Sequence, residues 1–155
     1  MSDKLKPYIW ILPVIVLDQL TKWAVVRWME AGESIPLIAG CFELCSVRNE
    51  GAAWGILHGQ RWILLAIAVL MLGLLIQQRR EIFKGGWLGR TAFSLLTGGI
   101  VGNVIDRLAR GQVVDFIHVY WRGIFDFPAF NVADSAICIG AGLYLLLSFR
   151  KKQGT

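Results

Sequence analysis

The chain has 155 residues, which is enough for one domain of ordinary size. Hydrophobic residues make up 55% of it and its mean hydropathy is +0.55, whereas soluble chains are roughly 45–50% apolar. The formal net charge of +5 would suit a nucleic-acid binder, but the basic residues cluster at the ends of long apolar runs rather than along a polar face. These features exclude a nucleic-acid-binding domain and predict a multi-pass membrane protein.

The first apolar run resembles the core of a cleavable signal peptide. It continues through Asp18, Lys22 and Trp28 without a small-residue cleavage site, so we read residues 8–28 as the first membrane span. Asp18 and Lys22 are four residues apart on one helix face, where they can pair while they face the interior of the bundle. An ion pair that only neutralises itself is an equally good explanation of this spacing.

Residues 29–59 do not form a span, because glycines and a proline interrupt the segment. Its 41–47 portion alternates at period two, which predicts a short strand or hairpin within an outer β-layer over residues 35–58. Asn49 and Gly51 mark a turn, and Trp54 suits the headgroup region. An ordinary connecting loop is the alternative interpretation.

The cysteines and histidines give no sign of a disulfide or a metal site. Cys41 and Cys45 would lie too far apart in a strand to bridge, and Cys138, inside the last apolar run, is expected to be a buried thiol. His58 and His118 lack ligand spacing with a cysteine, so no metal or other cofactor is implied.

Three further apolar runs predict spans over residues 62–78, 91–108 and 130–149, with a basic connector over residues 77–90. Gly98, Gly99 and Gly102 would let neighbouring helices approach closely. Both termini and the connector together carry nine basic residues, against five on the other side of the membrane. The positive-inside rule therefore predicts that both termini are cytoplasmic and that residues 29–61 and 109–130 face outward. The predicted fold is an all-α multi-pass membrane protein with four transmembrane helices, in a single domain over residues 1–155.

Two aspartates are brought to the outer side by this topology, Asp115 after the third span and Asp134 at the start of the fourth. Two carboxyl groups held close together cannot both ionise easily, so one keeps a proton while the other stays a base. Such a pair can deprotonate a water for attack on an amide carbonyl and protonate the leaving nitrogen. Two alternatives remain. Asp134 could instead cap the fourth helix together with Asn131, and Asp115 could be a solvated carboxylate in a loop.

Other polar residues lie near this pair in the sequence. Asn103 and Arg107, four residues apart on the third span, could orient a scissile segment through hydrogen bonds to its backbone. Asp106 directly precedes Arg107 and is expected to be paired, and Asp126, in a polar turn, is expected to be solvated. The chain has no His-Glu-x-x-His zinc motif and no Gly-x-Ser-x-Gly elbow, which argues against those hydrolase chemistries.

Five segments in order along the chain resemble the motifs of one family, the bacterial lipoprotein signal peptidases, also called signal peptidase II. They are DQLTK at 18–22, NEGAAWG at 49–55, GGIVGNVIDR at 98–107, VVDF at 113–116 and FPAFNVADS at 127–135. The resemblance covers nearly the whole chain. It implies an aspartic endopeptidase in the bacterial cytoplasmic (inner) membrane, with four transmembrane helices, a small extracytoplasmic β-cradle and an active site near the outer leaflet.

The resemblance also implies a substrate and a set of site residues. The substrate would be a prolipoprotein whose lipobox cysteine carries diacylglycerol, cut just before that cysteine. Asp115 and Asp134 match the family's catalytic dyad. The polar residues that match the family's substrate-binding surroundings are Asp18, Lys22, Asn49, Asn103, Arg107 and Asn131, with Asn49 and Arg107 as the expected substrate contacts. Trp54 stands where phenylalanine is usual, which affects the shape of the cradle.

Several partners follow from the resemblance and from lipid physics. Family members are blocked by the cyclic peptide globomycin, and we expect the same here, for a chain that acts as a monomer. A lipidated substrate stays in the bilayer, since each buried methylene contributes about 0.8 kcal/mol, so the peptidase must meet substrate and membrane lipid at the interface. Outer-segment aromatics would line the site or simply anchor the segment: Phe116, Tyr120, Trp121, Phe125 and Phe127.

Two functions of other classes remain open from the residues. A proton-coupled carrier could relay protons through Asp18, Lys22, Asp106 and Asp134, although the four predicted spans have no evident inverted repeat. A non-catalytic lipoprotein-binding factor would lose nothing when either aspartate of the pair is changed. Neither of these functions includes peptide cleavage.

Overall fold

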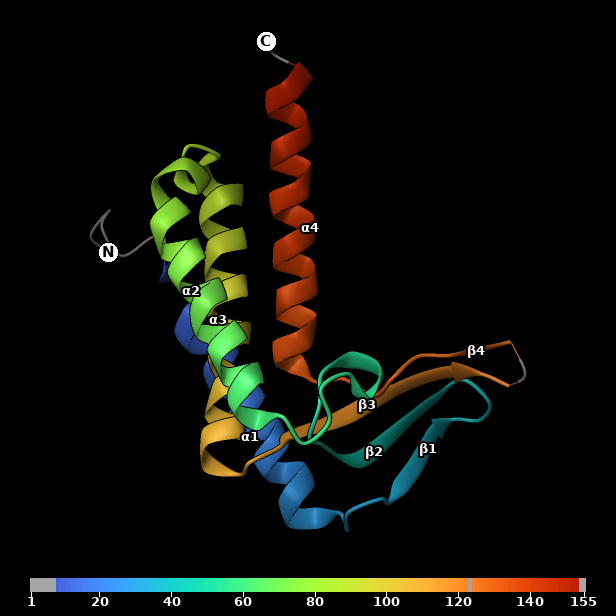
Figure 1. Cartoon of the computed structure of the whole chain (residues 1–155). Coiled ribbons are helices and arrows are strands. Elements are labelled where there is room, and N and C mark those ends of the chain that lie inside the picture. Colours follow the sequence, from blue (N-terminus) through green and yellow to red (C-terminus); the bar gives the residue numbers. More distant parts are fainter. Residues whose placement is uncertain (1–7, 123, 154–155) are drawn as a thin grey trace.

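The computed structural model describes residues 8–122 and 124–153, and in that part of the chain it has four α-helices and one antiparallel sheet (Figure 1). The helices are α1 (Ile11–Trp28), α2 (Arg61–Phe83), α3 (Gly86–Ala109) and α4 (Val132–Gln153). The strands are β1 (Ser34–Ile38), β2 (Phe42–Asn49), β3 (Val113–Trp121) and β4 (Phe125–Asp126), and a 3₁₀ turn, η2 (Ala53–Gly55), follows β2. The sheet, in the order β1-β2-β3-β4, lies at one end of the helix bundle (Figure 1).

Three helices, α2, α3 and α4, are each long and apolar enough to cross a membrane. The first helix is not in this group, because Asp18, Lys22 and Arg27 fall within its 18 residues. Asp18 and Lys22 nevertheless have no exposed surface, since α1 packs its polar face against the other helices. The described part of the chain therefore has three helices that could cross a membrane and a fourth, more polar helix packed beside them.

The basic connector predicted over residues 77–90 is wrong, because that stretch is mostly helical. Helix α2 continues to Phe83 and α3 begins at Gly86. Long charged side chains are good helix formers, and Lys84 Nζ pairs with Glu81 Oε1 at 2.6 Å across the end of α2. Lys4 and Lys6, which entered the charge count for the orientation, lie outside the described residues.

The outer β-layer predicted over residues 35–58 is confirmed in β1 and β2 and extends further than expected. β3 pairs antiparallel with β2, with Asn49 opposite Val113 and Val47 opposite Asp115. The period-two signal is missing from β3 because Val113, Val114, Asp115 and Phe116 are all buried. The small β-layer expected beside the helices is therefore a four-stranded antiparallel sheet.

A small apolar cluster fastens the sheet to the end of α1. Val25 of α1 and Met29, which directly follows that helix, pack with Val114 and Phe116 of β3. Phe116 is thus a core residue rather than an interfacial aromatic. Trp121, Phe125 and Phe127 are exposed, as an anchoring or lining role requires, and Tyr120 stacks on His118. Cys138, expected to be buried, is exposed, and all three cysteines are free.

Glycines let α3 contact its neighbours closely, as predicted. A Cβ atom at Gly102 would lie 2.7 Å from Asp18 Oδ2 of α1, and one at Gly99 would lie 2.4 Å from the carbonyl oxygen of Ala133 on α4. We expect Gly99→Ala to lower the stability by about 1–3 kcal/mol, because a backbone oxygen cannot move aside easily. Thermal unfolding in detergent measures this, with Gly73→Ala, which meets nothing within 4 Å, as the control. Equal unfolding temperatures for the two variants would contradict the packing.

Candidate active site

Asp115 and Asp134 come from different elements that meet where the sheet reaches the bundle. Asp115 lies on β3 and Asp134 in the first turn of α4, and both line one cavity of about 570 Å³. The aromatic rings of Trp54 and Phe127 form part of the same wall, with an edge-to-face contact at 6.1 Å between ring centroids. The cavity therefore has two carboxyl groups in largely apolar surroundings, together with Asn49, Asn103 and Arg107.

Asn131 connects the two carboxyl groups. Its side-chain Nδ2 donates to Asp115 Oδ1 at 2.7 Å, and its backbone N–H donates to Asp134 Oδ2 at 3.2 Å. The N–H of Asp134 donates in return to Asn131 Oδ1 at 2.9 Å. This reciprocal pair is a capping box, so the capping explanation of Asp134 is confirmed. Capping leaves Oδ1 of Asp134 available to another donor, and it does not remove the residue from the cavity.

Asp115 is not the solvated loop carboxylate that remained an alternative, because it is 2% exposed. Its two oxygens accept hydrogen bonds from Asn49 at 2.9 Å and from Asn131. Burial raises the pKa of Asp115 to about 7, and the nearby charge of Asp134 raises it as well, against the opposing effect of the two asparagine hydrogen bonds and the Lys22 charge. This carboxyl group is therefore partly protonated at neutral pH.

Behind the cavity lies a fully buried ionic network around Lys22. Its ammonium group contacts Asp18 Oδ2 at 2.9 Å, Asp106 Oδ2 at 3.0 Å and Asn103 Oδ1 at 2.9 Å. The other oxygen of Asp18 accepts the backbone N–H of Ala133, in the first turn of α4, at 2.9 Å. The predicted pairing of Asp18 with Lys22 is confirmed, and the network ties α1 to α3 and α4.

This network fixes the direction of the Asn103 side chain. Because Lys22 can only donate, it requires the amide oxygen of Asn103, which turns the amide nitrogen towards Asp134. That nitrogen donates to Asp134 Oδ1 at 2.7 Å. Lys22 therefore acts on the carboxyl pair through Asn103.

Some residues expected to bind substrate lie behind the cavity instead. Asp18, Lys22 and Asn131 have no exposed surface and are absent from the cavity wall, so they have no free face for a substrate in this structure. We assign them the positioning of other side chains. Asn49, Asn103 and Arg107 line the cavity and stay candidates for direct contact.

Arg107 and Asn49 also hold the loop that follows β2. Arg107 Nη2 donates to the carbonyl oxygen of Gly51 at 3.0 Å, and the N–H of Gly51 donates to Asn49 Oδ1 at 2.8 Å. The predicted turn at Asn49 and Gly51 is thereby confirmed. The same turn directs the amide nitrogen of Asn49 to Asp115.

Two other aspartates have partners that the sequence analysis did not assign. Asp106 pairs with Lys22 and with Arg110, not with the adjacent Arg107. The i,i+4 spacing of Asp106 and Arg110 was the available signal for that pair. The side chain of Asp126 is 81% exposed, as expected, and also bonds His118 Nε2 at 2.8 Å.

The fold and the cavity together define a small helical membrane protein with a polar site where the bundle meets its sheet. Residues 10–150 match the family model described as Signal peptidase (SPase) II. A lipoprotein signal peptidase from Halalkalibacterium halodurans is 47% identical over 147 residues, covering 94% of this chain and 93% of that protein. One from Shouchella clausii is 50% identical over 139 residues, covering 90% and 89%.

A solved structure shares the fold of this chain. A bacterial membrane enzyme determined at 2.3 Å by the in meso method superposes with a TM-score of 0.88 and 34% identity, over 96% of this chain and 90% of that one. The chain belongs to the signal peptidase II family. It is thus a bacterial membrane protease of the class that removes signal peptides from lipoproteins.

Proposed function

We propose that the chain is an aspartic endopeptidase in which Asp115 and Asp134 share a proton and activate water. Its substrate is a diacylglyceryl-modified prolipoprotein, which it cuts just before the lipidated cysteine. The observation that supports this most strongly is that carboxyl groups from β3 and α4 line one cavity and are bridged by Asn131.

The reaction needs one ionised and one protonated carboxyl group. The ionised member takes a proton from a water, whose oxygen attacks the carbonyl carbon before the cysteine. The protonated member gives its proton to the carbonyl oxygen and regains it when the tetrahedral intermediate collapses. The first member passes the proton taken from water to the leaving nitrogen as the C–N bond breaks. The products are a signal peptide with a new carboxylate and a lipoprotein with a free amine. Burial of Asp115, with its pKa of about 7, supports a shared proton at neutral pH.

We also propose the placement of the chain in the bacterial cytoplasmic membrane. Helix α1 is the fourth span, since its charges are buried against the bundle rather than turned to lipid. Both termini are cytoplasmic and the sheet lies at the outer leaflet, where exposed aromatics such as Trp54, Trp121 and Phe125 suit the headgroup region. The chain acts as a monomer, and globomycin inhibits it.

Cleavage of a purified precursor tests the proposed function. The chain, in detergent or proteoliposomes, is expected to cut a diacylglyceryl-modified precursor before its cysteine and to leave the unmodified precursor intact. Mass spectrometry of both products identifies the bond that is cut. Substrate-dependent proton flux without cleavage would favour a carrier, and binding without cleavage would favour a non-catalytic factor.

The pH dependence of cleavage follows from the pKa of Asp115. As the pH rises through about 7, Asp115 loses its proton and both carboxyl groups become ionised, so kcat/KM should fall on the alkaline side. Asn49→Ala removes a donor that stabilises the ionised form of Asp115, which raises that pKa. We therefore expect the alkaline limb to move up by about one pH unit, since a hydrogen bond to a charged group contributes about 1.5–3 kcal/mol. An alkaline limb that shifts to lower pH would contradict this assignment.

A further inference from the structure

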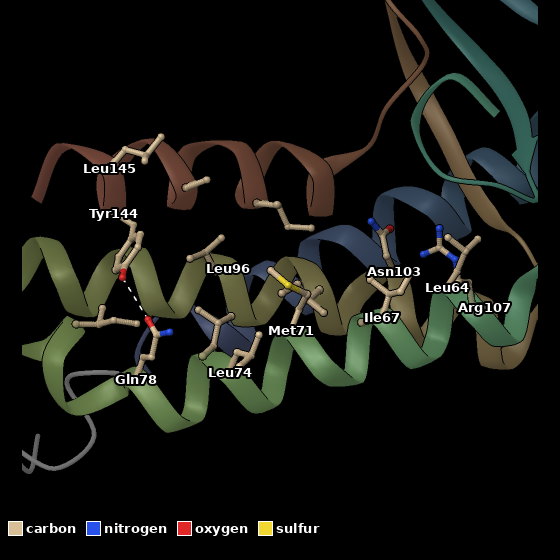
Figure 2. A pocket seen from close by; sticks show the side chains of 16 residues that line it. Leu64, Ile67, Met71, Leu74, Gln78, Leu96, Asn103, Arg107, Tyr144 and Leu145 are labelled. Atoms are coloured by element: carbon tan, nitrogen blue, oxygen red, sulfur yellow. Dashed lines mark hydrogen bonds between the residues drawn. The ribbon is translucent and has the colours of Figure 1, made fainter. Parts of the chain in front are cut away.

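A second cavity, of about 560 Å³, runs along the bundle on α3 between α2 and α4 (Figure 2). Its wall is almost entirely apolar and includes Leu64, Ile67, Met71, Leu96 and Ala141. We call this cavity the lateral groove. Ile67 and Met71 are 46% and 47% exposed. The groove is therefore open on the lateral face of the bundle, where membrane lipid would lie.

The lateral groove is continuous with the cavity of the carboxyl pair. Asn103, Arg107 and Ile137 line both cavities. At the opposite end Tyr144 Oη donates to Gln78 Oε1 at 3.3 Å, and Figure 2 shows this pair well away from Asn103 and Arg107. The groove thus leads from a solvent-accessible polar pair, far from the sheet, to the carboxyl groups beside the sheet.

We propose that the lateral groove holds the apolar helix of the substrate's signal peptide and delivers its C-terminal end to Asp115 and Asp134. This inference rests on the proposed function and names the part of the substrate that this surface binds. The apolar core of a signal peptide has about 7–15 residues, or about 10–22 Å as a helix. Along α2, Gln78 lies 14 positions after Leu64, which corresponds to about 21 Å. The lengths match.

The polar end of the groove distinguishes a peptide helix from an acyl chain. A helix presents four backbone N–H groups without intrahelical partners at its N-terminus, and the signal peptide would place that end at Gln78 and Tyr144. The free lone pairs of their side-chain oxygens can accept those N–H groups. An acyl chain has no donor for them, and a polar pair facing lipid alone is unfavourable. The groove therefore suits the signal helix better than the diacylglyceryl group.

A bulky side chain placed in the groove should weaken binding of the signal helix without slowing the cleavage step. Ala68 lines the groove, whereas Ala66 on the same helix is exposed and lies outside it. We expect Ala68→Trp to raise KM for a full precursor by about tenfold, and to leave unchanged the cleavage of a shortened lipidated peptide that lacks the apolar core. Ala66→Trp should leave both substrates unaffected. An equal loss on both substrates would assign the groove to the acyl chains, and no loss on either would also overturn the proposal.

A cross-linking measurement tests the groove without relying on turnover. A photoreactive benzoylphenylalanine in place of Met71, which lines the groove, should cross-link to the apolar core of a bound precursor. The same group in place of Val69, which is 62% exposed and outside the groove, should not. Cross-links at 71 without any cleavage by the wild type would reject the proposed chemistry but keep the groove. Cross-links to lipid alone at 71 would reject the groove.

The polar end has its own matched pair of variants. Gln78→Leu removes the acceptor at the end of the groove, and Gln77→Leu changes an exposed neighbour outside it. We expect Gln78→Leu to raise KM for the full precursor by about threefold to tenfold, with kcat for the shortened peptide unchanged. Equal KM values for the two variants would show that Gln78 does not contact the signal helix.

Discussion

Replacing Asp115 or Asp134 by Asn is expected to reduce cleavage of a diacylglyceryl-modified precursor at least about a thousandfold. An amide can neither take a proton from water nor carry the shared proton, so either change removes one half of the acid–base pair. The measurement is the initial rate of product formation by purified wild type and variants at equal concentration. Full activity in either variant would reject the assignment of the pair.

The controls for this experiment separate chemistry from folding. Asp126→Asn changes an exposed aspartate that bonds His118 on the sheet and is expected to keep near-wild-type activity. The Asp115 and Asp134 variants should still unfold cooperatively on heating and still bind the precursor. If either variant failed to fold, the carboxyl pair would be tested instead by the alkaline limb of the kcat/KM profile of Asn49→Ala.

Replacing Lys22 by Met is expected to cause the largest loss of stability, about 3–5 kcal/mol, because it leaves buried charges without their partner. Asp18 and Asp106 both contact the Lys22 ammonium group and have no exposed surface. The change also removes the ammonium donor to Asn103 Oδ1, so only the 3.3 Å hydrogen bond from Asn131 Nδ2 then keeps the amide nitrogen of Asn103 turned towards Asp134. Thermal or denaturant unfolding in detergent measures the stability, and the cleavage assay measures the second effect.

Two further variants test whether the loss of stability in Lys22→Met comes from the buried ionic network. Lys84→Met removes an exposed ion pair with Glu81 and should cost less than about 1 kcal/mol. Adding Asp18→Asn to Lys22→Met removes one uncompensated charge while keeping an acceptor for the N–H of Ala133, so it should restore part of the loss. A Lys22→Met protein as stable as Lys84→Met would show that the buried network is not what holds α1 in place.

Local spacing was enough to predict the pairs made within one element. Asp18 and Lys22, four residues apart, pair as expected, and the Asn131 capping box follows from the i,i+3 rule. The helix glycines predicted close contact, which Gly99 and Gly102 make. Topology alone brought Asp115 and Asp134 to the same side of the bundle.

Contacts between elements were beyond the reach of spacing. Asn103 accepts from Lys22 across 81 positions of sequence, and nothing in either local pattern selects that partner. β3 was missed because a strand buried on both faces lacks the alternation that identifies strands. The full burial of Lys22 and Asp18 was not predicted for a related reason, since a motif identifies a residue but not its depth in the fold.

Infrared titration of protonated carboxyl groups, in the wild type and the two Asn variants, tests the shared proton most directly. We predict one carboxyl band that persists to about pH 7 in the wild type and is absent from Asp115→Asn. In Asp134→Asn the same band should disappear at lower pH, because the neighbouring negative charge is gone. A wild type whose carboxyl groups all ionise below about pH 5, or a band that neither substitution changes, would contradict the account.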